Sequence, residues 1–130
     1  MRPLRLSVLP GTFAVCRLGP RAAIPAPLLG AAWVSITRTA DELSIVCAEE
    51  LAPAEARCER GFRCLVVEGP LPFSAVGILA SVAAPLAAAG IPILAVATHD
   101  TDYVLVRGER LQAARDALVD AGHEVGGHLG

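Results

Sequence analysis

The start of one expected helix carries residues that could hold a negatively charged group. Ser74 follows the helix-breaking residues Pro70 and Pro72 and stands where an N-cap belongs. The first backbone N–H groups of a helix have no partner within it, and the helix dipole is positive at that end, so a carboxylate is favoured there. Gly77 would let a ligand approach the backbone closely, and Ile78 follows it. This segment therefore predicts one half of a binding site.

A turn farther along the chain carries residues of the opposite kind. Asp102 could accept an ammonium group, and Thr98, Asp100 and Thr101 could contribute further oxygens. A ligand that presents a carboxylate and an ammonium group close together would satisfy both segments at once. Each residue also has a purely structural interpretation: the serine caps the helix, the glycine allows close helix–sheet packing, and the aspartates are ordinary turn residues.

A switch in hydrophobic period predicts the elements that position these residues. The spacing behind Ser74 is helical, and the helix should end at Gly90, because glycine suits the C′ position and Pro92 prevents continuation. Its apolar face would hold Val76, Leu79, Val82 and Leu86. A second helix runs from Gly108 to Gly122. The predicted strands are Arg63–Gly69, Ile91–Thr98, Asp102–Arg107 and a last edge strand, His123–Val125, so the order is β-α-β-β-α-β.

The first half of the chain shows a reduced form of the same order. Pro10 and Gly11 predict a hairpin turn between strands Leu4–Leu9 and Thr12–Arg17. Prolines exclude a long helix in the next segment but leave room for one turn at Ala26–Leu29. Two strands follow, Trp33–Thr37 and Leu43–Cys47. A polar segment, Glu49–Arg60, should then form one or two short helical turns.

An internal repeat relates the two halves. When the chain is shifted by sixty residues, Ile36–Leu51 lies over Val96–Leu111 without a gap and with three identities. The spacing from Gly11 to Trp33 also equals that from Gly69 to Ile91. We therefore expect two units, residues 1–61 and 62–130, of which the first has its helices eroded by prolines.

A membrane helix is the alternative interpretation of the central apolar stretch. No charged residue occurs between Glu68 and Asp100. The stretch is rich in alanine and interrupted by glycines and prolines, which favours a buried helix followed by a strand.

Composition narrows the function classes. The chain has 130 residues, is 54% hydrophobic and carries a formal net charge of -2, with few aromatic residues. This argues against a surface for nucleic acid or anionic membranes, which needs clustered cations, and against the aromatic platform of an RNA-recognition module. The apolar run before Pro10 is too short for a signal-peptide core, so we expect a cytoplasmic protein.

The residues that could support catalysis or bind a metal form no recognisable pattern. The cysteines contain no CxxC pair or zinc-ligand spacing, so we expect buried, reduced thiols. The histidines are expected to be solvated. Nucleophile, Walker and dinucleotide motifs are absent from the sequence, so no enzyme activity, cofactor or metal is expected. The four cysteines are Cys16, Cys47, Cys58 and Cys64, and the three histidines are His99, His123 and His128.

The motifs resemble a known family over nearly the whole chain. The run VEGPLPFSAVGILASVAAPLAAAGIPILAVATHDTDYVLV resembles the ACT domain of the CASTOR type. The segments LSVLPGTFAVCRL and SITRTADELSIVC resemble the companion half of small bacterial tandem-ACT proteins, and the chain is also similar to the regulatory halves of aspartokinases. The resemblance implies an α+β fold of two tandem ferredoxin-like, ACT-type units.

The resemblance also implies a function. ACT domains of this kind are non-catalytic regulatory modules that bind small ligands, here most naturally an amino acid, at an ACT–ACT interface. This chain has two ACT-like units where the animal CASTOR proteins have four, which implies that a complete site requires a dimer. We expect a homodimer because each sheet leaves edge strands and an apolar Ala, Val and Leu surface that a small two-unit protein cannot cover alone. The alternative is a dimerisation or scaffold module that regulates a protein partner without binding a ligand.

Overall fold

The computed structural model describes residues 3–72 and 74–127, which divide into two compact units. The C-terminal unit contains the described residues of Met1–Pro10 and Arg63–Gly130, and the N-terminal unit is Gly11–Phe62. The sequence placed one boundary near residue 61, where the chain does pass from one unit to the other. Residues up to Pro10, however, are grouped with the C-terminal unit rather than with the segment that follows them.

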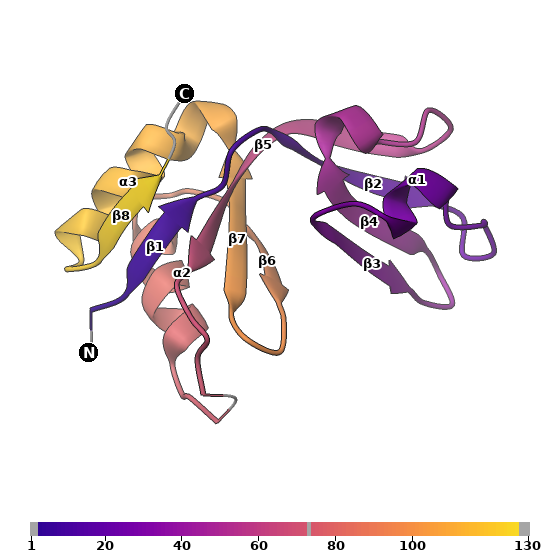
Figure 1. Cartoon of the computed structure of the whole chain (residues 1–130). Helices are drawn as coiled ribbons and strands as arrows, with labels where there is room; N and C mark the ends of the chain where they lie inside the picture. The colour runs from indigo at the N-terminus through magenta and orange to yellow at the C-terminus, as the bar shows by residue number, and fades with distance from the viewer. Residues whose placement is uncertain (1–2, 73, 128–130) are drawn as a thin grey trace. The chain divides into compact units, whose positions relative to one another are not determined.

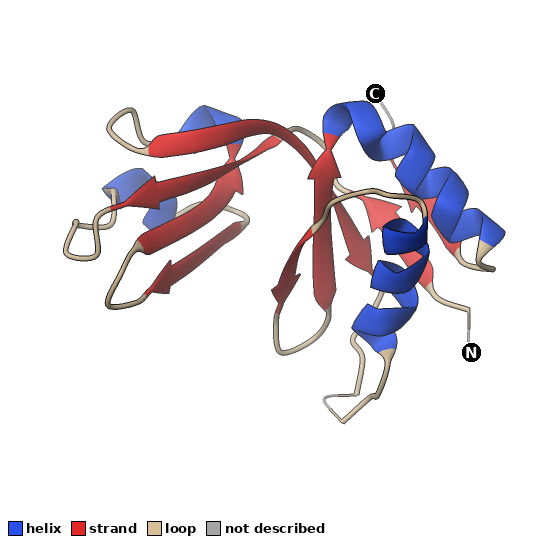
Figure 2. Ribbon diagram, turned by 180° about the vertical axis from the view of Figure 1, so that it is seen from behind, coloured by secondary structure: helices blue, strands red, loops and turns tan. Residues whose placement is uncertain are grey.

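The C-terminal unit is a sheet with two helices on one face (Figures 1 and 2). The strand order is β8-β1-β5-β7-β6. The strands are β1 (Arg5–Val8), β5 (Arg57–Val67), β6 (Leu94–Ala97), β7 (Asp102–Arg107) and β8 (Glu124–Gly127). The helices are α2 (Ile78–Ala88) and α3 (Leu111–Asp120), and the short 3-10 turn η2 (Gly108–Arg110) leads into α3. Apart from the inserted β1, this is the predicted β-α-β-β-α-β order.

The expected hairpin between the first two strands is wrong. Gly11 adopts the left-handed conformation that a turn requires, with φ at 84°. Even so, β1 pairs antiparallel with β5 and parallel with β8, with Leu6 opposite both Val67 and Val125. This pairing buries Leu6 completely within the core. The turn signal did not fold β2 back on β1, because both strands pair antiparallel with β5 and therefore run in the same sense. The partners of β1 are set by where its apolar face can be buried.

The helix α2 begins later than its sequence pattern predicts. Val76, which was assigned to the buried face, is 95% exposed, because the chain becomes helical only at Ile78. The end is as predicted: Gly90 is left-handed with φ at 73°, and the Ile91 N–H donates to the Leu86 carbonyl at 2.9 Å. The buried core beneath both helices includes Leu65, Val67, Val82, Leu86, Val104, Val106, Ala114 and Leu118.

The N-terminal unit has the same strand order with smaller helices. Its order is β3-β4-β2-β5, which matches β6-β7-β5-β8 once β1 is left out. The elements are β2 (Phe13–Leu18), α1 (Ala26–Leu29), β3 (Val34–Arg38), β4 (Leu43–Ala48), η1 (Glu49–Leu51) and the first half of β5. The α+β, ferredoxin-like prediction is therefore confirmed, including the reduced helices of the first unit.

The strand β5 is longer than the sequence indicated. The sequence pattern assigns residues 57–60 to a polar, partly helical segment, but they belong to β5, and residues 57–59 pair with β2, with Arg57 opposite Arg17. A register shift separates this part from the pairing of Phe62 with Phe13, and Gly61 lies there with φ at 80°. The first residues of β5 are mostly exposed and carry polar side chains, so they lack the apolar pattern by which a strand is predicted.

The central apolar stretch forms α2 and β6 in place of a single span. Among the described residues, none of the helices combines the length and the apolar character that crossing a bilayer requires.

One expected solvated histidine is buried. His99 is exposed, and His128 lies outside the described residues, but His123 is only 7% exposed. Its Nδ1 accepts the Leu4 N–H at 3.0 Å, which leaves the proton on Nε2 to be donated to the Ser81 carbonyl at 2.9 Å. His123 therefore joins the segment before β1 to α2, a long-range contact that sequence spacing cannot reveal.

We predict that His123→Ala lowers the free energy of unfolding by about 2 to 4 kcal/mol, because it leaves a cavity and two buried backbone groups without their partner. Chemical denaturation of the purified protein measures this loss. His99→Ala is the control and should change the free energy of unfolding by less than about 0.5 kcal/mol. Equal stability of both variants would contradict the proposed role of His123.

Candidate ligand-binding pocket

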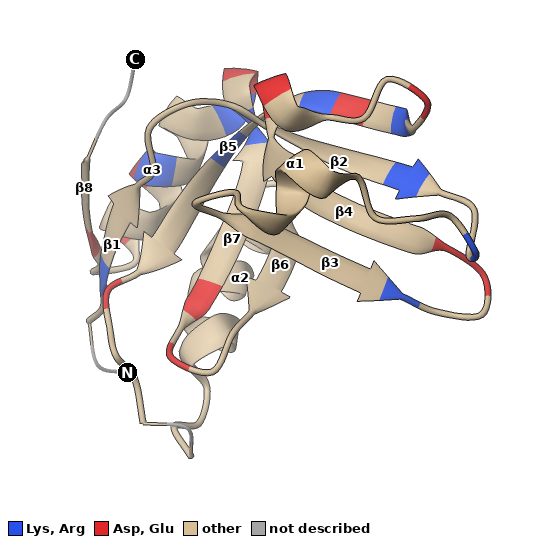
Figure 3. Ribbon diagram, turned by 45° about the vertical axis from the view of Figure 1, so that its right-hand side comes forward, with Lys and Arg blue, Asp and Glu red and all other residues tan. Residues whose placement is uncertain are grey.

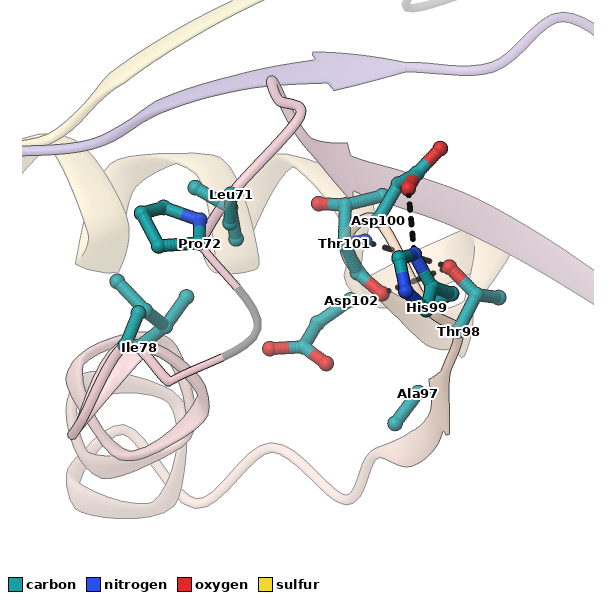
Figure 4. Close-up of a pocket in the computed structure, with 10 residues that line it drawn as sticks. Leu71, Pro72, Ile78, Ala97, Thr98, His99, Asp100, Thr101 and Asp102 are labelled. Carbon is teal, nitrogen blue, oxygen red and sulfur yellow. Dashed lines mark hydrogen bonds and ion pairs between the residues drawn. The ribbon is translucent and has the colours of Figure 1, made fainter.

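A pocket of about 210 Å³ lies in the C-terminal unit, between the loop that precedes α2 and the turn that joins β6 to β7 (Figure 4). Its walls come from segments far apart in the sequence. They are Leu71, Pro72, Ala75 and Ile78 on one side and residues 97–102 on the other. The two segments that the sequence nominated for a binding site therefore face the same pocket.

Five of the seven nominated residues line this pocket, namely Ile78, Thr98, Asp100, Thr101 and Asp102. Ser74 and Gly77 are not among the lining residues. Ser74 is exposed and precedes the helix by several residues, so its expected capping role is wrong. The N-cap is Gly77, which is left-handed with φ at 80° and provides no side-chain cap. A glycine fits this position because a side chain is strained at such a φ.

The N-terminus of α2 opens beside the pocket at Ile78. The first hydrogen bond of the helix runs from the Ser81 N–H to the Gly77 carbonyl at 3.0 Å. The N–H groups of residues 78–80 precede this bond, so they are the donors that a helix leaves for a cap, for water or for a ligand. The positive end of the helix dipole lies at the same place, which favours an anionic group.

The two threonines of the turn use their hydroxyl groups to hold its shape. The Thr98 hydroxyl donates to the Thr101 carbonyl at 2.9 Å and accepts the Thr101 N–H at 3.3 Å. The Thr101 hydroxyl donates to the carbonyl of Val67, the last residue of β5. Both hydroxyl protons are thus engaged within the protein, so these hydroxyls could meet a ligand only as hydrogen-bond acceptors.

A second contact, which the sequence did not indicate, joins the two walls. The Leu71 N–H donates to the Asp100 carbonyl at 2.7 Å. A Cβ atom at Gly69 would lie 2.9 Å from the Leu71 nitrogen and 3.1 Å from the Asp100 oxygen, so the close approach requires glycine. The only signal in the sequence was the Gly-Pro pair at 69 and 70, which we interpreted simply as a break before the helix.

The two aspartates differ in where their carboxylates point. The Asp100 carboxylate lies 2.9 Å from Nδ1 of His99, and Figure 4 shows it directed away from the pocket. Asp102 is half-buried, and Figure 4 shows its carboxylate directed into the space that faces Ile78. No arginine is among the lining residues, and Figure 3 shows the acidic turn at the start of β7. The pocket therefore has an acidic wall that suits a cationic group.

The pocket offers groups that could bind a charged small molecule. One wall offers a carboxylate, and the other offers the N–H groups of a helix N-terminus. Its volume of about 210 Å³ is smaller than the roughly 300 to 1,000 Å³ of typical ligand sites. One chain therefore encloses a small ligand only in part.

Comparisons with known proteins identify the family. A family model of the ACT domain matches residues 57–120, and a second model, of an N-terminal domain, matches residues 11–55. A protein from Agobacterium tumefaciens whose crystal structure is known is 41% identical, and the match covers 98% of this chain and 96% of that one with a TM-score of 0.91. This chain belongs to the ACT-domain family.

More distant structures share the ACT fold. One is a Vibrio cholerae protein of unknown function, described as a possible transport protein, with 23% identity, coverage of 91% and 89%, and a TM-score of 0.72. Another is the regulatory subunit of aspartate kinase from Thermus thermophilus, in its ligand-free form, with 14% identity, coverage of 86% and 93%, and a TM-score of 0.62. No curated protein matches the chain. Membership of the ACT family supports a regulatory, ligand-binding role.

We predict that Gly69→Ala separates the two walls of the pocket, because its methyl group would press on the backbone of Leu71 and Asp100. The free energy of unfolding should fall by about 1 to 3 kcal/mol. Gly126→Ala is the control, since a Cβ there meets no atom within 4 Å. Thermal denaturation of both variants checks this; an unchanged melting temperature for Gly69→Ala would show that the walls are held by other contacts.

Proposed function

We propose that this chain is a non-catalytic, cytoplasmic regulatory protein that binds an amino acid in the pocket between the start of α2 and the β6–β7 turn. The half-buried Asp102 carboxylate, directed into the pocket, is the observation that carries the proposal. It supplies a partner for the ammonium group of the ligand. The N–H groups at the start of α2 supply a partner for the carboxylate of the ligand.

The electrostatics favour one molecule that carries both charges. A ligand with only a carboxylate would enter beside Asp102 and be repelled, and a ligand with only an ammonium group would meet the positive end of α2. An α-amino acid carries both charged groups on the same carbon atom, so one molecule can satisfy both walls. The pocket offers no obvious machinery for catalysis, because its threonine hydroxyls hold the turn and its histidine is engaged by Asp100.

A second copy of the chain would complete the pocket. Val76 stands in the loop before α2, next to Ala75 of the pocket wall, and its side chain is 95% exposed. On the other wall, β6 is an edge strand whose strand partner in the described sheet is β7. An exposed valine and an open strand edge on either side of a partly open pocket suit an interface between ACT domains.

The rival function is a dimerisation or scaffold module that regulates a partner protein without binding a ligand. The same edge strand and exposed valine would serve it, so the two functions differ only in what fills the pocket. Ligand-dependent stabilisation separates them.

We predict that a thermal-shift screen of the free amino acids identifies at least one ligand. A ligand at a hundredfold excess over its Kd contributes about 2.7 kcal/mol, which raises the melting temperature by several degrees. Asp102→Asn should then weaken binding by at least about tenfold in calorimetry, because it removes the charge that pairs with the ammonium group. Asp100→Asn is the matched control and should bind almost normally.

Two results would count against this proposal. A screen without any hit would favour the scaffold, and an Asp102→Asn variant with unchanged affinity would mean that the ligand sits elsewhere.

We also predict that the protein is a homodimer whose interface includes Val76 and the open edge of β6. Light scattering at micromolar concentration should give twice the 13.4 kDa mass of one chain. Val76→Lys should shift the protein toward the monomer, because it places a charge in an apolar contact. Val119→Lys on α3, where the valine is 49% exposed, should leave the mass unchanged. A wild-type monomer, or equal effects of the two lysines, would place the interface on another surface or remove it.

A further inference from the structure

Two cysteines of the N-terminal unit face each other on neighbouring strands. Cys16 of β2 lies directly opposite Cys58 of β5 in antiparallel register, and their Sγ atoms are 2.7 Å apart. Opposed residues on antiparallel strands have Cα atoms about 4.5 to 5.5 Å apart, which lies within the range that a disulfide spans. The backbone therefore already holds the two sulfurs within bonding reach, and closing a bond would need little movement of the strands.

We propose that Cys16 and Cys58 are an oxidation site, at which the two thiols form a reversible intramolecular disulfide in exchange with a low-molecular-weight disulfide such as oxidised glutathione. The two cysteines are 42 positions apart in the sequence, so nothing in their spacing suggested a pair. The fold alone brings them together.

The two thiols differ in how easily a reagent can reach them. Cys16 is 1% exposed, whereas Cys58 is only partly buried and is the most accessible of the four cysteines. Burial raises the pKa of the Cys16 thiol well above its ordinary value, and the neighbouring Cys58 thiol raises the pKa further. A thiolate is the attacking species in disulfide exchange, so a reagent reacts at Cys58 first.

The exchange balances in two steps. The Cys58 thiolate attacks one sulfur of the oxidant, which forms a mixed disulfide and releases one small thiol. Cys16 then loses its proton and attacks the Cys58 sulfur, which closes the protein disulfide and releases the second small thiol. Two electrons pass from the protein to the oxidant, and the two protons of the cysteines end on the released thiols.

The other two cysteines are poorer sites for this chemistry. Cys47 and Cys64 are completely buried, and burial raises the pKa of both thiols, for Cys64 to about 12. Cys47 lies near Cys16 in the same core, so it is the competing partner that an experiment must exclude. Among the described residues, no group of three or more His, Cys, Asp or Glu side chains could hold a metal ion.

The disulfide would fasten β5 to β2 and close a covalent loop around α1, β3 and β4. A closed loop restricts the unfolded chain, so the oxidised protein should resist heat better than the reduced protein. This consequence is separate from ligand binding, because both cysteines lie in the N-terminal unit and the pocket is built by residues of the C-terminal unit.

Incubation of the folded, reduced protein with oxidised glutathione tests the proposal. We expect the loss of two titratable thiols, a mass lower by two hydrogen atoms, and a digest in which the peptides of Cys16 and Cys58 are joined. The melting temperature should rise by several degrees and return to its original value after treatment with dithiothreitol.

Matched variants distinguish the pair from the other cysteines. Cys58→Ser should abolish both the thiol loss and the rise in melting temperature, while Cys47→Ser and Cys64→Ser should retain them. If serine at position 58 perturbs folding, alkylation of native protein gives the same test, because Cys58 should react first and its alkylation should block closure. A persistent mixed disulfide on Cys58, a Cys16–Cys47 link, or no loss of thiols would overturn the proposal.

Discussion

The pairing of β1 between β5 and β8 is the interaction on which the C-terminal unit depends. The position of β1 inside the sheet buries Leu6 and Val8 in the core, and the pairing on both sides satisfies its backbone groups. His123 adds a polar connection, since its ring joins the backbone of Leu4 to that of Ser81 in α2. Without β1, the strands β5 and β8 would each expose an edge, and the core would lose one of its walls.

The same sheet also positions the walls of the pocket. The carbonyl of Val67, at the end of β5, holds the hydroxyl of Thr101, and the chain then crosses the turn so that Leu71 binds the Asp100 carbonyl. Two hydrogen bonds thus join the turn to the segment that leads into α2. These bonds hold Leu71, on one wall of the pocket, against the turn that carries Asp102 on the other wall. This is the kind of support that a preformed binding site needs.

Local patterns in the sequence were sufficient for much of this arrangement. Hydrophobic periodicity and glycine or proline breaks predicted α2, the turn at 99–101 and the reduced helices of the first unit, because each depends on neighbouring residues. The same patterns nominated the pocket walls, including Asp102. They failed where a partner far along the chain decides the outcome. Neither the insertion of β1 nor the burial of His123 has a local signature. The N-cap of α2 is Gly77 rather than Ser74, and no side chain caps the helix there.

The placement of β1 also bears on the order in which the chain can fold. The N-terminal unit, residues 11–62, is an insertion between the first strand of the C-terminal unit and the remainder of that unit. During synthesis the inserted unit has all of its residues available early, whereas β1 must wait for β8, and the contact between Leu4 and His123 spans 119 positions. Contacts of such long range slow folding, since the loop between them must close before they form. We therefore expect the inserted unit to fold first and to shorten the loop, bringing β1 and β5 near one another before the last strand emerges.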